Sequence, residues 1–147
     1  MKKNAKKICG IVLAVCLIIG FIYVQFDSLI SYANVVEANW NIRLPFECED
    51  VYGVDEGPSF HGDGFRYNVL GCDEAVKMSE VEVLPISTMP EGYKYKIKEI
   101  VETLKVPQEH LPQDIETFYY ENKDGSDELF ILIDSDKTKI YVIESFI

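Results

Sequence analysis

The chain has 147 residues, enough for one modest domain and a short additional segment. It carries 25 acidic residues against 14 lysines and arginines, a formal net charge of −11. All the acids lie at or after Asp27, where only ten basic residues accompany them, so that part has a formal charge of about −15. This charge disfavours nucleic acid as a partner, because nucleic acids are bound by basic patches. A basic protein or peptide, divalent cations or a simply well-solvated surface remain open.

The N-terminal segment predicts a membrane anchor. Residues 1–7 hold four lysines and no acid, and residues 8–26 hold no charge at all. Nineteen helical residues span about 28 Å, close to the ~30 Å hydrocarbon core of a bilayer. The lysines place the N-terminus in the cytoplasm. We therefore expect a single-pass protein of the cell membrane, with a basic cytoplasmic tail at 1–7, a transmembrane helix at 8–26 and an extracytoplasmic remainder.

Two other N-terminal signals compete with this anchor. A cleaved signal peptide has a shorter apolar run followed by a small-x-small site, and no such site follows this run. A lipoprotein signal would need a small residue before Cys16, but Val15 is bulky and the apolar run continues beyond it. Both alternatives are less favoured than an uncleaved anchor.

Residues 27–40 predict an amphipathic juxtamembrane stalk. Leu29, Tyr32, Val36 and Trp40 recur at spacings of three or four, which is typical of a helix. We expect the domain itself to occupy residues 41–147, with Trp40 packed on it.

Cys48 and Cys72 are the only cysteines beyond the predicted membrane segment. Two cysteines outside the cytoplasm often form a disulfide, and two buried free thiols are the alternative. The chain contains no C-x-x-C pair and no histidine cluster, so the cysteines do not predict a zinc site.

The first half of the domain is rich in turn residues. The acidic stretch FECEDVYGVDEGP is followed by SFHGDGFRYNVLGC, in which Phe65, Tyr67 and Val69 alternate with polar residues as in a strand. HGDG, residues 61–64, precedes that strand and is typical of a hairpin connection. Residues 73–86 fit either a short helix or a strand.

One main helix is predicted around residues 90–105. Thr88 and Glu91 form a capping-box pattern, an apolar i, i+3, i+4, i+7 series follows from Ile97, and Pro107 ends the helix. IETFYYEN, ELFILID and KIYVIESFI then predict three strands in a meander, the second buried on both faces. The predicted fold class is α+β: an N-terminal transmembrane helix, then a small domain whose antiparallel sheet packs on one main helix.

Two of these stretches carry a resemblance. GPSFHGDGF and LFILIDSDKTKIYVIESF resemble the FHGDG-like segment and the closing hairpin of a group of small anchored or exported proteins of Gram-positive bacteria. The match covers about 30 residues of the domain. The resemblance implies a small extracytoplasmic domain and brings no activity with it.

The FHGDG stretch is the main candidate site. His61 and Asp63, with Asp55 and Glu56 nearby, are ligand types for a divalent ion, but the calcium-loop spacing is missing and only His110 could add a second histidine. Ser59, His61 and Asp63 are too close in sequence to form a hydrolase triad. The favoured interpretation is a turn, in which Gly62 and Gly64 meet the backbone geometry; a recognition loop is the next.

The predicted function is accordingly modest. We expect a non-catalytic extracytoplasmic interaction or accessory module without a cofactor, which meets a basic protein or peptide and no nucleic acid. The alternative is a metal-dependent cell-surface enzyme that uses His61 and Asp63. The tyrosines, among them Tyr93, Tyr95, Tyr119 and Tyr120, are suited either to an interface or to an ordinary half-buried position.

Overall fold

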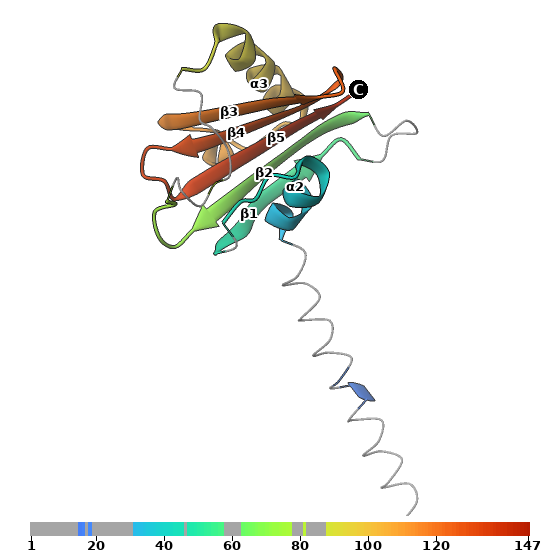
Figure 1. The fold of residues 1–147 in the computed structure, drawn as a ribbon, viewed down its shortest axis with the longest axis vertical. Helices are drawn as coiled ribbons and strands as arrows, with labels where there is room; N and C mark the ends of the chain where they lie inside the picture. Colours follow the sequence, from blue (N-terminus) through green and yellow to red (C-terminus); the bar gives the residue numbers. More distant parts are fainter. Residues whose placement is uncertain are drawn as a thin grey trace, which may run out of the picture.

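The computed structural model describes residues 15, 16, 18, 31–45, 47–57, 63–77, 81 and 88–147. They form an α+β domain around one five-stranded antiparallel sheet, which confirms the predicted class of the domain (Figure 1). The strands lie in the order β1-β2-β5-β4-β3. Their bounds are Cys48–Asp55 for β1, Gly64–Cys72 for β2, Ile115–Lys123 for β3, Asp127–Asp134 for β4 and Lys139–Phe146 for β5.

The three C-terminal strands form the predicted meander, and β5 joins it to β2. β4 and β5 are the strands whose residues are buried on both faces, because each has a neighbour on either side and a helix layer above and below. Asp124 and Gly125 adopt positive φ in the turn between β3 and β4, as the Asp-Gly pair predicts.

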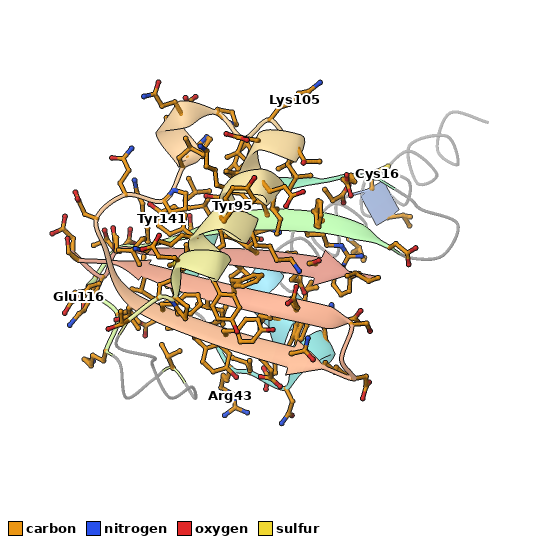
Figure 2. The ribbon with its side chains drawn as sticks, turned by 90° about the horizontal axis from the view of Figure 1, so that it is seen from above. Cys16, Arg43, Tyr95, Lys105, Glu116 and Tyr141 are labelled. Atoms are coloured by element: carbon orange, nitrogen blue, oxygen red, sulfur yellow. A yellow bond between two sulfur atoms is a disulfide. The ribbon has the colours of Figure 1, made fainter. Side chains whose placement is uncertain are left out.

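Helix α3, Glu91–Thr103, covers one face of the sheet, as Figure 2 shows from above. It buries Ile97 and Ile100, and Leu104 follows them in the same apolar cluster with Tyr67 and Phe130 of the sheet. The predicted helix of residues 90–105 is therefore present with slightly narrower bounds.

Both ends of α3 differ from the prediction. The residue before the first helical turn is Pro90, and no side chain caps the helix there, so the capping box from Thr88 is wrong. At the other end, Lys105 adopts φ 54, and the amides of Lys105 and Val106 bond to the carbonyls of Glu102 and Val101. This Schellman arrangement stops the helix before Pro107 can do so.

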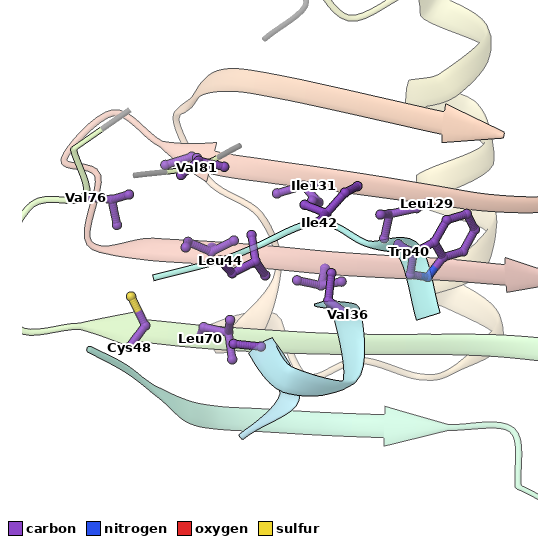
Figure 3. Packing of buried hydrophobic residues seen from close by; sticks show 14 residues of the cluster. Val36, Trp40, Ile42, Leu44, Cys48, Leu70, Val76, Val81, Leu129 and Ile131 are labelled. Atoms are coloured by element: carbon purple, nitrogen blue, oxygen red, sulfur yellow. The ribbon is translucent and has the colours of Figure 1, made fainter. Parts of the chain in front are cut away.

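Helix α2, Tyr32–Trp40, covers the opposite face. Ser31 caps its N-terminus by accepting from the Ala33 amide, and Asn41 ends it in the left-handed region at φ 55. The apolar side of α2 packs on the sheet together with Ile42 and Leu44, which come after the helix, as the close-up in Figure 3 shows. The buried residues of this segment are Ala33, Val36, Trp40, Ile42 and Leu44.

This packing corrects the predicted role of residues 32–40. The segment has helical periodicity, as expected, but it is part of the folded core and not a separate stalk. The sheet therefore packs between two helices, where the sequence predicted one. The physical reason is that β4 and β5 are apolar on both faces, and α3 can cover only one of them.

Strand β1 was not predicted, because its acidic residues obscure the alternation of apolar and polar positions that marks a strand. A register shift between Asp50 and Tyr52 places Val51 in a bulge. Beyond the bulge, Tyr52 and Val54 point to the α3 face and join its apolar cluster. The bulge therefore resets which residues of the strand face the core.

The Cys48–Cys72 disulfide is confirmed. The two residues are directly opposite each other in the β1–β2 pair, and their sulfur atoms are bonded. The bridge joins the end of the edge strand to the interior strand β2.

The predicted membrane segment falls almost wholly outside the described residues. Among the described ones, no helix has the length and apolar character needed to cross a bilayer. The ambiguous stretch 73–86 is described only at residues 73–77 and at residue 81, where Val76 and Val81 contribute to the core on the α2 side of the sheet.

Candidate functional site

A polar groove opens on the α2 face of the sheet, beside the edge strand β1. It has a volume of about 590 Å³. Its lining consists of Tyr32, Gly53, Val54, Asp55, Arg66 and Asn68. The groove therefore brings together the start of α2 and the two strands that flank the FHGDG stretch.

The pairing of β1 with β2 explains why these side chains meet. Asp55 lies opposite Arg66, and Gly53 lies opposite Asn68. These positions alternate with Tyr67 and Val69, which are buried under α3, so all four face α2. A cation, a carboxylate and an amide thus occupy neighbouring places on one surface.

Gly53 leaves the space that the Asn68 side chain uses. A Cβ atom added at Gly53 would lie 2.5 Å from Asn68 Oδ1, closer than real Cβ contacts allow. Any other residue at this position would have to displace the amide, so Gly53 shapes the floor of the groove.

Behind the groove lies a fully buried carboxylate, that of Glu144 on β5. The Tyr32 hydroxyl donates to its Oε2, and Trp40 Nε1 donates to its Oε1 at 2.6 Å. Both donors come from α2, so a buried charge joins this helix to the centre of the sheet. Hydrogen bonds to each oxygen are what makes a buried carboxylate tolerable.

Arg66 lies on β2, the strand next to the one that carries this carboxylate. It is opposite Asp55 on one side and opposite Glu144 on the other, and its guanidinium lies 4.8 Å above the ring of Phe146. Burial, followed by the nearby charge of Glu144 and the hydrogen bond to it, raises the pKa of Tyr32, and the Arg66 cation opposes this in part. Tyr32 therefore stays a neutral donor.

The start of α2 is held by the same edge strand. The carboxylate of Asp50 accepts from the Tyr32 amide at 3.0 and 3.1 Å, which satisfies a free donor at the helix N-terminus. Asp50 lies on the α2 face because it precedes the bulge at Val51.

This arrangement is suited to binding through hydrogen bonds and charge. Arg66 and Asn68 supply donors, Asp55 and Asn68 supply acceptors, and the ring of Tyr32 supplies a flat surface. The carboxylate of Glu144, behind the groove, is fully buried and accepts hydrogen bonds from two donors, so it does not reach the groove.

The FHGDG stretch belongs to the connection between β1 and β2, the two strands that line the groove. His61 and Gly62 fall outside the described residues. Asp63 is exposed, and Gly64 starts β2 with φ +141, a conformation that favours glycine. Glu56 closes the hairpin, because its amide bonds to the Phe65 carbonyl and its carboxylate accepts from the Phe65 amide. A hairpin connection at this place is confirmed.

A metal centre in this hairpin remains a prediction. Within the described part of the chain, no three histidine, cysteine, aspartate or glutamate residues are close enough to hold an ion. His61 lies outside that part, so the proposed pairing of His61 with Asp63 is untested.

The remaining candidates lie elsewhere. His110 ends the short 3-10 helix η2, Gln108–His110, where a loop was predicted; it is half-buried and its ring stacks on Tyr52 at 4.3 Å. On α3, Tyr93 stacks on Tyr120 at 4.3 Å, while Tyr95 is 74% exposed on the outer side of the helix (Figure 2). Tyr119 lies on the opposite face. The tyrosines therefore do not form one surface.

A smaller hollow of about 280 Å³ lies at the other end of β1, against the disulfide. Its acids, Glu47, Asp73 and Glu74, are accompanied by Lys77.

No family model matches this chain, and neither a curated protein nor a solved structure matches it. The resemblance to Gram-positive anchored proteins is therefore an expectation from the sequence alone.

Of the residues that line the groove, sequence reasoning singled out only Asp55; it missed Tyr32, Gly53, Arg66 and Asn68, and also Glu144 behind the groove. Glu144 had a signal, because it is the one acid within the otherwise apolar run of the last predicted strand, KIYVIESFI. A charged residue in such a run must be paired, and its partners on α2 are more than 100 residues away in sequence.

Proposed function

We propose that the chain is a single-pass, membrane-anchored extracytoplasmic module that binds a basic segment of a partner protein and does not catalyse a reaction. The groove between α2 and β1 supports this proposal, because it offers recognition groups at the surface, while the carboxylate of Glu144 behind it is fully buried. The membrane anchor rests on residues 1–26 of the sequence.

The charge of the edge strand supports a basic partner. Between Arg43 and Arg66 the chain has six acids and no lysine or arginine. Four of them, Glu49, Asp50, Asp55 and Glu56, lie on β1 or directly after it, and all four are exposed. A surface of one sign favours an oppositely charged partner and speeds their encounter.

A peptide-binding experiment tests the proposal. The full-length chain in detergent is titrated with two peptides of equal length. One alternates threonine with lysine, and the other alternates threonine with glutamate. We expect the lysine peptide to bind and the glutamate peptide not to bind. Affinity should fall steeply with added salt, because exposed charges are screened.

Matched variants assign the effect to β1. The double variant Glu49→Gln with Asp55→Asn removes two charges from the edge strand. It should lower the affinity for the lysine peptide roughly tenfold, since each exposed ionic contact contributes up to about 1 kcal/mol. Glu99→Gln with Glu102→Gln removes two exposed charges from α3 and should leave the affinity unchanged. Equal binding of both peptides, or equal losses in both double variants, would refute the proposed function.

A further inference from the structure

The outer edge of β1 carries backbone groups that face away from its partner strand. In an antiparallel pair, residues opposite each other alternate between wide pairs, which exchange hydrogen bonds, and narrow pairs, which direct N–H and C=O outward. The Glu56 amide bonds to the Phe65 carbonyl, so Glu56 and Phe65 form a wide pair. Counting back along the register makes Asp55 and Gly53 members of narrow pairs.

Gly53 and Asp55 therefore present their amides and carbonyls at the open edge. β1 is the terminal strand of the sheet, and no hydrogen bond to these four backbone groups from another segment is found among the residues that the structure describes. Unpaired edge groups of this kind are what an added strand uses.

The same two residues line the groove. Gly53 and Asp55 face α2, whereas Tyr52 and Val54, between them, face α3 and are half-buried. An added strand would continue both faces of the sheet. Its residues on the α2 side would lie next to the groove, and those on the α3 side would lie next to Tyr52 and Val54.

We propose that an extended, amphipathic basic segment of a partner protein adds to the sheet as a sixth strand along Gly53–Asp55. This inference rests on the proposed function and names its binding mode. The partner has lysine or arginine opposite Asp55, because side chains of opposite charge attract when they lie directly across from each other on neighbouring strands. Two residues away, opposite Gly53, it places a polar side chain within reach of the Asn68 amide, whose Oδ1 lies over Gly53.

The alternate residues of the partner are apolar, because they extend the surface formed by Tyr52 and Val54. The bulge at Val51 limits the length of the added strand, since pairing is interrupted where the edge is kinked. The acids of β1 exclude acidic or like-charged edges, including a second copy of this strand. The structure thus selects one class of partner by charge, pattern and length.

Amide hydrogen exchange of the full-length chain in detergent tests this binding mode directly. The probe is an eight-residue peptide alternating valine with threonine or lysine. We expect the amides of Gly53 and Asp55 to exchange at least tenfold more slowly when the peptide is bound. The amides of Tyr52 and Val54 already bond to β2 and serve as the internal control.

Two modified peptides separate the binding mode from the proposed function. A version methylated on alternate backbone nitrogens keeps its charge but cannot donate to the edge, and it should bind at least tenfold more weakly. A version with the same composition but lysine and valine mixed on both faces should also bind more weakly. If the parent and the methylated peptide bind equally, strand addition is overturned while recognition of a basic segment stands.

A charge exchange completes the test. The Asp55→Lys variant should no longer bind the lysine peptide, and it should bind a peptide in which glutamate replaces lysine. Because Asp55 also accepts from the Gly57 amide, circular dichroism checks that the variant is folded. Should it not fold, the methylated peptide with the unaltered protein decides the question. Failure of every basic peptide to bind overturns the proposed function and the binding mode together.

Discussion

Trp40 offers a sharp test of how α2 is held to the sheet. Its Nε1 donates to Glu144 Oε1 at 2.6 Å, and the acceptor is a carboxylate with no exposed surface. Replacing Trp40 with Phe keeps most of the buried ring and removes this donor. A hydrogen bond to a charged group contributes about 1.5–3 kcal/mol, and the smaller ring adds a cavity term. We therefore expect Trp40→Phe to lower the free energy of unfolding by about 2–4 kcal/mol.

A double-mutant cycle isolates the hydrogen bond from the change in ring size. Glu144→Met has similar length and no carboxylate, so Trp40→Phe in that background loses only packing. The cost of Trp40→Phe should be smaller there by about 1.5–3 kcal/mol, which is the coupling energy between the two side chains.

The assay is urea unfolding of the full-length chain in detergent, followed by far-ultraviolet circular dichroism. Fluorescence is unsuitable for the variant, because Trp40 is the only tryptophan. In the unaltered protein, the same tryptophan reports directly on the docking of α2. A coupling energy below about 0.5 kcal/mol would show that the two residues act independently, and would refute the claim that the buried carboxylate holds the helix.

Two further predictions concern the disulfide and the tyrosines. Replacing Cys48 and Cys72 with serine should cost about 3 kcal/mol, since the bridge closes a loop between residues 24 apart in sequence, and should lower the melting temperature by about 10 °C; an unchanged melting temperature in calorimetry would count against it. Burial raises the pKa of Tyr67 above its ordinary value of 10.0, so the unfolded chain loses this proton first as pH rises. This contribution to stability is complete below pH 10.0 and is lost above it. Urea unfolding at a series of alkaline pH values should show a fall in stability that is shallower in Tyr67→Phe; equal slopes would contradict it.

The helix and the closing strands of the domain could be predicted because their signals are local. The apolar series of α3 and the continuous apolar runs of β4 and β5 lie in single stretches of sequence, and each decides its own secondary structure. The ends of α3 could not be predicted as well. Lys105 accepts a left-handed conformation that is usually taken by glycine, and this depends on the packing of the residues after the helix.

The edge strand and the groove could not be predicted for a different reason. The alternation of β1 is broken by a bulge, and its outer face is acidic, so the stretch has the composition of a loop. The neighbours in the groove come from separate segments: Tyr32 from α2, Asp55 from β1 and Arg66 from β2. The sequence does not show that these residues are neighbours, because their proximity depends on the register of the strands.

The sequence by itself determined the fold class, the main helix, the meander, the strongly acidic surface and the cysteine pair. These follow from periodicity, composition and counting, which need no knowledge of how distant segments meet. Only the tertiary structure decided that residues 32–40 belong to the core, that β1 is an open edge and that Glu144 is buried beneath α2. The physical reason is that a sheet apolar on both faces must be covered twice, and the segment that covers the second face is chosen by shape and by partners for a buried charge, both of which exist only once the chain has folded.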